Sequence, residues 1–312
     1  MIKRRLIIDT DPGVDDAFAI LLAASDPQTE ILALTTTAGN VGIERTTRNA
    51  LGLKELLGLN CPVFKGADRP LAIPLEDAAN VHGESGLGPY VFDHVPALET
   101  SELAWDAIYR LAKANPGSTL VALGPLTNIA IALMRYPDLP DVLGEVISMG
   151  GTIGYGNTVP YSEFNYYCDP LAAKIVLESK LKVTTVGLNA TRQTQLSPDE
   201  LASLDPQDPV LNRFVRLQRE FYWDRLRNLG MEGFHLPDAA AMAVVLEPVL
   251  MHAERLPVHV VTDNGITQGW TVVDLRRRKD EKLHQVNVAL SIDKTGYLRL
   301  MQQINGLKGG HA

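Results

Sequence analysis

The sequence lacks several features that would place it in a secreted, membrane or nucleic-acid-binding class. Its two cysteines, Cys61 and Cys168, are too few for a disulfide framework or a zinc pattern. No apolar stretch approaches the length of about 18 residues that a membrane span needs, and no signal-peptide pattern is present at the N-terminus. Cationic residues are scarce: 29 Lys and Arg against 37 Asp and Glu give a net charge of −8, which argues against nucleic acids and anionic membranes as partners. We therefore expect a protein of the cytoplasm.

Motifs for nucleotide phosphates and for serine nucleophiles are also missing. There is no G-x-x-x-x-G-K-[ST] segment and no G-x-G-x-x-G after a strand, so the chain has no obvious phosphate cradle. Ser85, in the sequence HGESG at 82–86, lacks the G-x-S-x-G spacing of a nucleophile elbow. Cys168 directly precedes Asp169-Pro170 at an expected helix start, and we interpret it as structural.

Strand-like and helix-like patterns alternate through the first two-thirds of the chain. They predict strands at 4–9, 30–37, 119–123, 143–149 and 182–187, and helices at 15–25, 43–58, 102–115, 126–134 and 170–179. This alternation predicts an α/β fold with an open, mainly parallel central sheet and helices on both faces. Residues 197–247 are predicted to be mainly helical, and strands return from about 256 before a short final helix. No repeat or linker divides the chain, so we expect one domain over 1–312.

Four carboxylates lie within eight residues, in the sequence DTDPGVDD at 9–16, between an apolar strand and an apolar helix. In an open parallel sheet, this strand end lies at the ligand-binding edge. A helix N-terminus favours one anion, and Asp15 or Asp16 could simply cap the helix. Two carboxylates about 4 Å apart repel by roughly 4 kcal/mol at an effective dielectric near 20, so the others must be protonated, point away or share a cation. Acids without a thiol or an imidazole among them suit a hard ion, Ca²⁺ or Mg²⁺.

Other predicted strands also end in glycine, amide or acidic residues. Strand 30–37 is followed by Gly39 and Asn40, strand 119–123 by GPLTN at 124–128, and strand 143–149 by a glycine pair and the loop that carries Asn157 and 163–165. The carboxyl ends of parallel strands share one edge. Such an edge suits a cation together with a polyhydroxylated ligand. Each segment alone is equally compatible with a turn or a helix start, but their coincidence at strand ends favours binding.

In this order, the segments resemble the nucleoside hydrolases, the inosine-uridine-preferring nucleosidase family. The resemblance rests on 9–17, TTAGN at 36–40, VHGESGLG at 81–88, GPLTNIA at 124–130, SMGG at 148–151, EFN at 163–165 with Asp169-Pro170, and GWTVVD at 269–274. It covers nearly the whole chain. It implies calcium-dependent hydrolysis of the N-glycosidic bond of ribonucleosides to ribose and a free base, by a homodimer or homotetramer.

The resemblance also implies a role for individual residues. Asp11, Asp16, Asp238 and the main-chain carbonyl of Leu123 would bind the Ca²⁺ ion, and Asp11 would also take a proton from the attacking water. The remaining positions would bind the sugar: Asp15, Asn40 and Asn165 at the ribose hydroxyls, Asn157 and Glu163 at the 5′ end, and Met149 and Phe164 packed against the ring.

One position departs from the family pattern. In the best-known branch, a histidine precedes the aspartate matched here by Asp238 and protonates the leaving base, whereas this chain has Pro237. A general acid typically contributes about 10²–10⁴-fold to the rate, and proline cannot act as one. We predict that His235 or His82 takes the role; Tyr222 and Arg225 are further candidates. The sequence does not decide between purine and pyrimidine bases.

Two alternative functions remain open at this stage. If the acid is lost, the chain is a catalytically weak nucleoside- or ribose-binding protein that keeps the metal site. In addition, Asp9-Thr10-Asp11 superficially resembles the Asp-x-Asp motif of haloacid-dehalogenase-type phosphotransferases, although Pro12 and Gly13 fit that motif badly.

Overall fold

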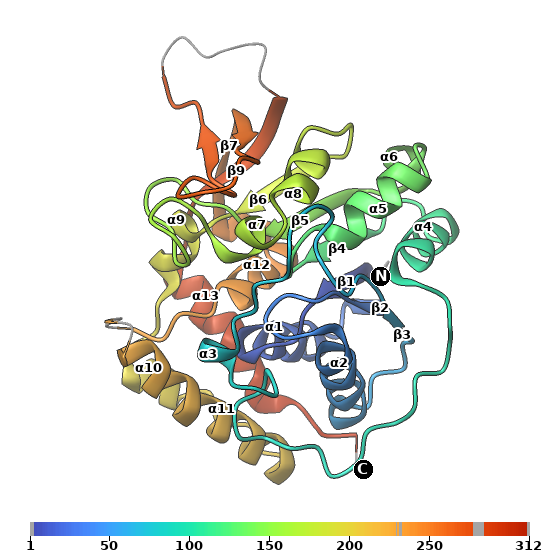
Figure 1. Cartoon of the computed structure of the whole chain (residues 1–312). Coiled ribbons are helices and arrows are strands. Elements are labelled where there is room, and N and C mark those ends of the chain that lie inside the picture. The colour runs from blue at the N-terminus through green and yellow to red at the C-terminus, as the bar shows by residue number, and fades with distance from the viewer. Residues whose placement is uncertain (1–2, 229, 231–232, 277–283, 311–312) are drawn as a thin grey trace.

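The computed structural model describes residues 3–228, 230, 233–276 and 284–310, and within them nine strands form one sheet (Figure 1). The strand order is β3-β2-β1-β4-β5-β6-β9-β7-β8. The strands from β3 to β9 in this order are parallel, and β7 is antiparallel to both β9 and β8. Their bounds are β1 (Arg4–Thr10), β2 (Thr29–Thr36), β3 (Val63–Lys65), β4 (Thr119–Ala122), β5 (Glu145–Met149), β6 (Val183–Val186), β7 (Met251–Val260), β8 (Thr271–Val273) and β9 (His284–Ile292).

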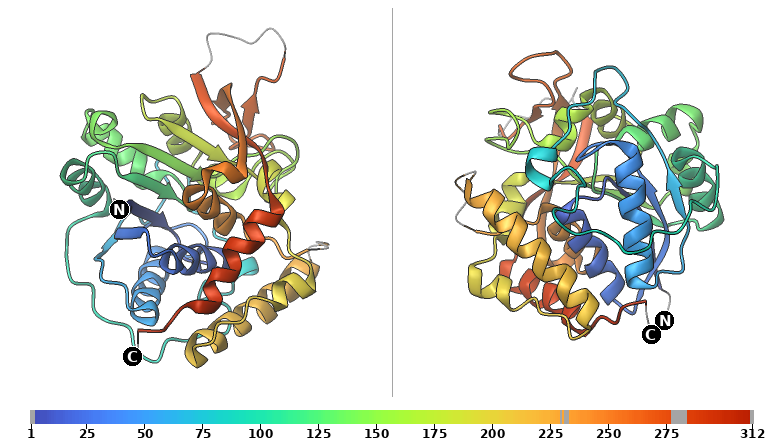
Figure 2. Two further views of the ribbon diagram at one scale, coloured as in Figure 1. Left: turned by 180° about the vertical axis from the view of Figure 1, so that it is seen from behind. Right: turned by 60° about the horizontal axis from the view of Figure 1, so that its bottom comes forward.

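Helices cover both faces of this sheet (Figures 1 and 2). One face carries α4, α5 and α8, and the other carries α1, α2, α12 and α13. The α-helices are α1 (Val14–Ser25), α2 (Ile43–Leu57), α3 (Ala79–His82), α4 (Ala104–Ala114), α5 (Thr127–Arg135), α6 (Leu139–Val142), α7 (Phe164–Cys168), α8 (Pro170–Leu177), α9 (Leu188–Thr191), α10 (Pro198–Ala202), α11 (Pro209–Asn228), α12 (Pro237–Leu246) and α13 (Lys294–Met301). In the described part of the chain, none of them has both the length and the apolar character to cross a membrane.

The side chains of β1 point alternately to the two faces of the sheet, and each face packs against its own hydrophobic core. Leu6 and Ile8 are buried in the cluster that includes α1, α2 and α12, whereas Ile7 is buried in the cluster of α4, α5 and α8. Successive side chains of a strand point to opposite faces, so a strand covered on both sides is apolar throughout. These observations confirm the predicted α/β class with a mainly parallel sheet.

Apart from the short helices α3, α7 and α9, which were not predicted, the structure differs from the predicted elements in three places. Strand β3 was not predicted, because three residues are too few to show a periodicity. Residues 139–142 form α6, so β5 begins at Glu145 instead of 143. Strand β7 begins at Met251 instead of about 256. Its first half was not predicted because it is largely solvent-exposed and carries charged residues, which hide the apolar alternation.

The chain reverses its direction across the sheet at β1. Strand β1 pairs with β2 on one side and with β4 on the other, which makes its carboxyl end a topological switch point. Ligands of open α/β sheets bind in the crevice at such a point. The acidic segment 9–16 therefore lies at the position where this fold places a site.

Candidate active site

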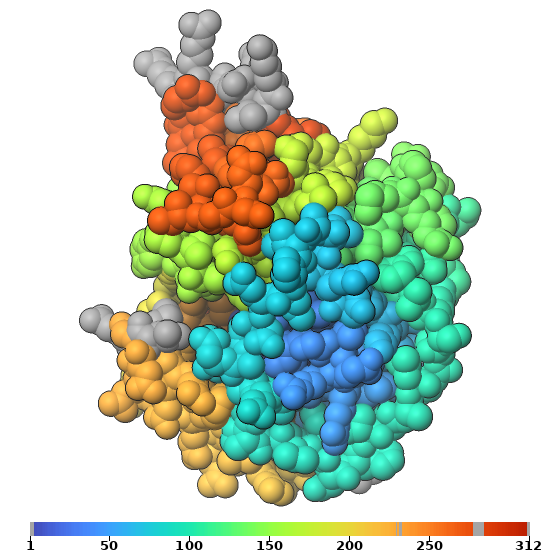
Figure 3. Space-filling model, viewed as in Figure 1, coloured from blue at the N-terminus to red at the C-terminus, as the bar shows by residue number. Residues whose placement is uncertain are grey.

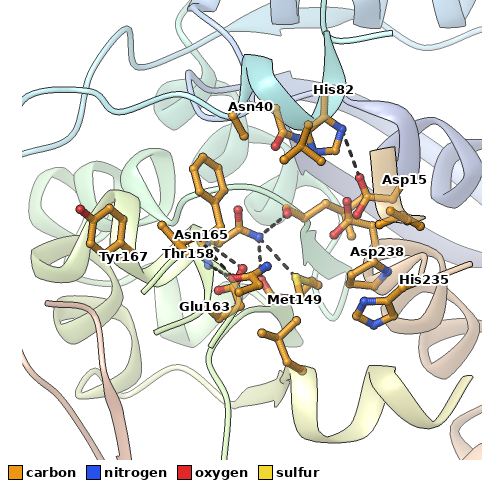
Figure 4. Close-up of a pocket in the computed structure, with 18 of the residues that line it drawn as sticks. Asp15, Asn40, His82, Met149, Thr158, Glu163, Asn165, Tyr167, His235 and Asp238 are labelled. Atoms are coloured by element: carbon orange, nitrogen blue, oxygen red, sulfur yellow. Dashed lines mark hydrogen bonds and ion pairs between the residues drawn. The ribbon is translucent and has the colours of Figure 1, made fainter. Parts of the chain in front are cut away.

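A cavity of about 330 Å³ lies at this edge of the sheet (Figure 4). Its wall is completed by the segment between β3 and α3, which crosses the front of the molecule (Figure 3). The residues that the family resemblance assigns to the metal or the sugar line the cavity, as do both candidate histidines; the exceptions are Asp11 and Asp16, which are fully buried. The lining residues from the prediction are Asp15, Asn40, His82, Leu123, Met149, Asn157, Glu163, Phe164, Asn165, His235 and Asp238.

Three buried carboxylates meet at one side of the cavity. Oxygen atoms of Asp15, Asp16 and Asp238 all lie within 4.8 Å of one another. They come together because α1 and α12 pack against each other and each acid lies in the first turn of its helix. Helix N-termini favour negative charge. Asp16 also caps α1, since its Oδ2 accepts the N–H of Gly13 at 3.0 Å; capping therefore accounts for one acid but not for the cluster.

Asp11 is held next to this cluster by Asn40. The main-chain N–H of Asn40 donates to Asp11 Oδ2 at 2.6 Å, and its side-chain Nδ2 donates to Asp16 Oδ2 at 3.0 Å. Gly39 and Gly124 make room for the Asp11 carboxylate, because a Cβ at either position would collide with it. The segment TTAGN at 36–40 thus holds the Asp11 carboxylate through Asn40, and the close approach of its backbone requires glycine at position 39.

Burial and mutual repulsion raise the pKa values of these carboxyls. Desolvation, and then the charge of Asp16, raises the pKa of Asp15 to about 7. Desolvation and then the charge of Asp16 raise the pKa of Asp11 well above the usual range, and desolvation followed by the charges of Asp15 and Asp16 does so for Asp238. Asp11 Oδ1 and Asp15 Oδ1 are buried and accept no hydrogen bond from any residue in the described ranges. Such unpartnered oxygens fit a bound hard cation, which would supply the missing partner.

The Leu123 carbonyl, predicted to bind the metal, already has one hydrogen bond. Asn165 Nδ2 donates to the Leu123 oxygen at 2.6 Å and to the Met149 oxygen at 3.1 Å. A carbonyl oxygen has two lone pairs, so this bond leaves one for a cation. Asn165, predicted to bind ribose, therefore also fixes two main-chain carbonyls at the cavity.

The residues predicted for the 5′ end of the nucleoside also shape their own loop. Glu163 caps α7, because its Oε1 accepts the N–H of Asn165 at 2.8 Å and its Oε2 accepts the N–H of Tyr166 at 3.2 Å. Its Oε2 also accepts the N–H of Gly151 at 3.0 Å. Burial raises the pKa of Glu163 to about 7. Asn157 Oδ1 accepts the N–H of Phe164 at 3.0 Å. The loop after β5 is thus tied together by the same side chains that face the cavity.

Both candidate histidines line the cavity in neutral form. His82 Nδ1 accepts the N–H of Val14 at 3.2 Å, so the neutral ring carries its proton on Nε2. Burial lowers the pKa of His82 to about 4, and burial followed by the charge of Arg192 lowers the pKa of His235 to about 3. His235 Nε2 lies 3.0 Å from Thr191 Oγ1.

Of the two further candidates for contact with the leaving base, only Tyr222 lies at the cavity. Tyr222 lines the cavity and stacks on His82, with ring centroids 5.6 Å apart. Arg225 instead contacts the ring of Phe221 at 5.2 Å and is not among the lining residues. Pro237 lines the cavity as the first residue of α12, where a missing N–H leaves no helical bond unmade.

Six polar residues of the cavity wall were not predicted from the sequence: Glu76, Asp77, Asn80, Thr158, Tyr167 and Arg192. Glu76 and Asp77 come from the segment between β3 and α3 and Asn80 from α3 itself, where no strand or motif signal could have found them. Arg192 lies shortly after the predicted strand 182–187. The strand-end argument applied to the other strands would have found it.

The cavity is lined by carboxylates and amides and lies at the switch point of a parallel sheet. This arrangement is typical of α/β enzymes that act on small polar molecules. The chain belongs to the inosine-uridine preferring nucleoside hydrolase family, whose sequence model matches residues 6–299. This match confirms the resemblance seen in the sequence and excludes the phosphotransferase alternative.

Individual relatives agree over almost the whole chain. The non-specific ribonucleoside hydrolase RihC of Salmonella paratyphi B is 40% identical over 301 residues, which are 96% of each chain. The plant nucleoside hydrolase PpNRh1 superposes with a TM-score of 0.90 at 32% identity, covering 97% of this chain and 98% of that one. The purine-preferring ribonucleoside hydrolase from Gardnerella vaginalis has a TM-score of 0.89 at 32% identity, covering 97% and 99%.

Proposed function

We propose that this protein is a calcium-dependent ribonucleoside hydrolase, which cleaves the N-glycosidic bond to give ribose and a free purine or pyrimidine base. Family membership and the activities in the names of its relatives support the reaction. The observation that carries the proposal is the buried group of Asp15, Asp16 and Asp238 beside Asp11, with unpartnered oxygens on Asp11 and Asp15, next to a cavity of about 330 Å³.

Four groups would hold the cation: the carboxylates of Asp11, Asp16 and Asp238 and the carbonyl of Leu123. Asp15, which completes the compact cluster, lies close enough to share it or to bind a ribose hydroxyl beside it. A bound Ca²⁺ would orient a water molecule and make it easier to deprotonate. All the donors are oxygen atoms, which is the ligand set that calcium prefers.

The protein groups divide the chemical work. Asp11 Oδ1, which has no hydrogen-bond partner among the described residues, accepts the proton of the attacking water. Cleavage of the C1′–N bond builds positive charge on the ribose, and the fixed carboxylates stabilise that charge where it develops. Asp15, Asn40 and Asn165 hold the ribose hydroxyls, which converts binding energy into alignment. The remaining predicted contacts complete the sugar site: Asn157 and Glu163 at the 5′ end, and Met149 and Phe164 against the ring.

The basic test is product analysis with ordinary nucleosides. With Ca²⁺ present, the purified protein should release free base and reducing sugar in equal amounts from inosine or uridine, measured by chromatography and a reducing-sugar assay. No turnover of inosine, uridine or p-nitrophenyl riboside would contradict the proposal and favour the nucleoside-binding alternative.

The leaving-group acid can be assigned with an activated substrate. A nitrophenolate leaves without a proton, so loss of the acid should slow inosine and uridine by about 10²–10⁴-fold but p-nitrophenyl riboside far less. We expect this pattern from His82→Gln or His235→Gln, and the variant that shows it identifies the acid. His259→Gln is the matched control, because His259 pairs with Glu178 outside the cavity. Equal losses on both kinds of substrate would assign the histidine a positioning role.

A further inference from the structure

The short helix α9 and the residue that follows it connect two parts of the cavity wall. Asn189 Oδ1 accepts the N–H of Ile153 at 3.2 Å, which ties α9 to the loop after β5. Thr191 Oγ1 lies 3.0 Å from Nε2 of His235, which ties the same turn to the base of α12. Leu188 and Arg192 themselves line the cavity.

Arg192 makes the strongest of these connections. Its Nη1 donates to the carbonyl of Tyr155 at 2.7 Å, and its Nη2 donates to the carbonyl of Gly156 at 2.8 Å. The guanidinium carbon also lies 3.7 Å from the centroid of the Tyr155 ring. A planar guanidinium can bind two adjacent carbonyls and stack on a ring at the same time, which lysine cannot do.

The loop held in this way carries a proposed sugar contact. Asn157 directly follows Gly156, and its main-chain N–H donates to the carbonyl of Ser162 at 3.2 Å. Gly156 N–H donates to the carbonyl of Pro160 at 2.9 Å. These bonds close the loop on itself, but Asn157 is solvent-exposed and Tyr155 is 68% exposed. Packing alone therefore holds this loop weakly, and the two Arg192 bonds add to the Asn189–Ile153 bond in linking it to the end of α9.

We propose that Arg192 is a positioning residue: it holds Tyr155 and Gly156 so that Asn157 meets the 5′-hydroxyl of the nucleoside. This inference rests on the proposed function and adds to it a determinant of selectivity for the 5′ end. Arg192 is the one arginine or lysine that lines the described cavity, where acids otherwise dominate. Its charge also contributes to the low pKa of His235, so the residue affects both ends of the site.

The test compares substrates with and without the 5′-hydroxyl. In Arg192→Met, the ratio of kcat/KM for inosine to kcat/KM for 5′-deoxyinosine should fall about tenfold, toward the ratio of Asn157→Ala, because a charge-assisted pair of hydrogen bonds is lost. In Arg192→Lys, the same ratio should fall less. Arg135→Met is the matched control, since Arg135 also lies over a tyrosine ring, that of Tyr136, but outside the cavity. Its ratio should equal that of the wild type.

A second measurement does not depend on activity. Hydrogen–deuterium exchange should become faster in residues 152–158 of Arg192→Met and stay unchanged in Arg135→Met. An unchanged substrate ratio, or unchanged exchange in this loop, would overturn the inference. If the wild type hydrolyses no riboside, the proposed function fails, and the exchange experiment alone decides whether Arg192 fixes the loop.

Discussion

Asp11→Ala is expected to lower kcat/KM for ribonucleosides by at least about 10³-fold. The change removes the proposed base, typically worth about 10²–10⁴-fold, together with a proposed calcium ligand. Asp11→Asn should lose nearly as much activity, because the amide still accepts the Asn40 N–H but cannot accept a proton from water. Steady-state kinetics with inosine and uridine measures both effects.

A neighbouring aspartate provides the control for this experiment. Asp9 is also completely buried, and its Oδ2 likewise has no hydrogen-bond partner among the described residues. Its Oδ1 accepts from Thr35 at 2.6 Å and from Asn128 at 2.8 Å, and Asp9 belongs to no proposed ligand set. Asp9→Asn should therefore keep most of the activity of the folded enzyme. Circular dichroism melts confirm folding in each variant. Near-normal rates in Asp11→Ala would show that the attacking water is activated elsewhere.

Removal of calcium should abolish turnover and destabilise the protein more as the pH rises. The folded-state pKa of Asp15 is raised from 3.8 to about 7. Proton binding therefore stabilises the folded apoprotein fully below the unfolded pKa, and this stabilisation is lost as the pH rises through about 7. If calcium binds as proposed, it replaces those protons, so its stabilising effect should grow over the same window. At a hundredfold excess over Kd, it should contribute about 2.7 kcal/mol.

Thermal melts with EDTA or with saturating Ca²⁺, at about pH 5.5 and about pH 8, measure this linkage. The difference in Tm should be larger at the higher pH, and Asp238→Asn should reduce it at both. Parallel melts with Mg²⁺ test the identity of the ion. If EDTA changes neither activity nor Tm at either pH, the acid cluster does not bind a metal.

The fold was predictable because its signal is local. The alternation of apolar strands with amphipathic helices depends on side chains a few residues apart. Among the parallel strands it missed only β3, since β9 lies in the strand region predicted from about 256. β3 is too short to show a hydrophobic period, and the exposed start of β7 lacks the apolar alternation of a buried strand. Strand order, in contrast, depends on long-range pairing, and the insertion of β9 between β6 and β7 has no counterpart in sequence order.

The grouping of the candidate site residues was predictable, but their atomic contacts were not. The strand-end argument grouped the acids of residues 9–16 with amides at one edge of the sheet, the family resemblance added Asp238, and the structure places Asp238 beside Asp15 and Asp16. They did not predict that the cluster would consist of Asp15, Asp16 and Asp238, with Asp11 beside it. Nor did they predict that Asn40, Asn165 and Glu163, the expected substrate contacts, would also form hydrogen bonds with other groups of the protein. Such details depend on how side chains share partners, which spacing along a chain does not encode.

The acid cluster spans most of the polypeptide, since Asp15 and Asp16 belong to the first helix and Asp238 to α12. During synthesis on the ribosome, the first helix emerges long before its partner. The third acid of the cluster therefore joins the other two only after α12 has been synthesised and has docked on α1. The proposed ion would have its full set of ligands only from that point of synthesis onward.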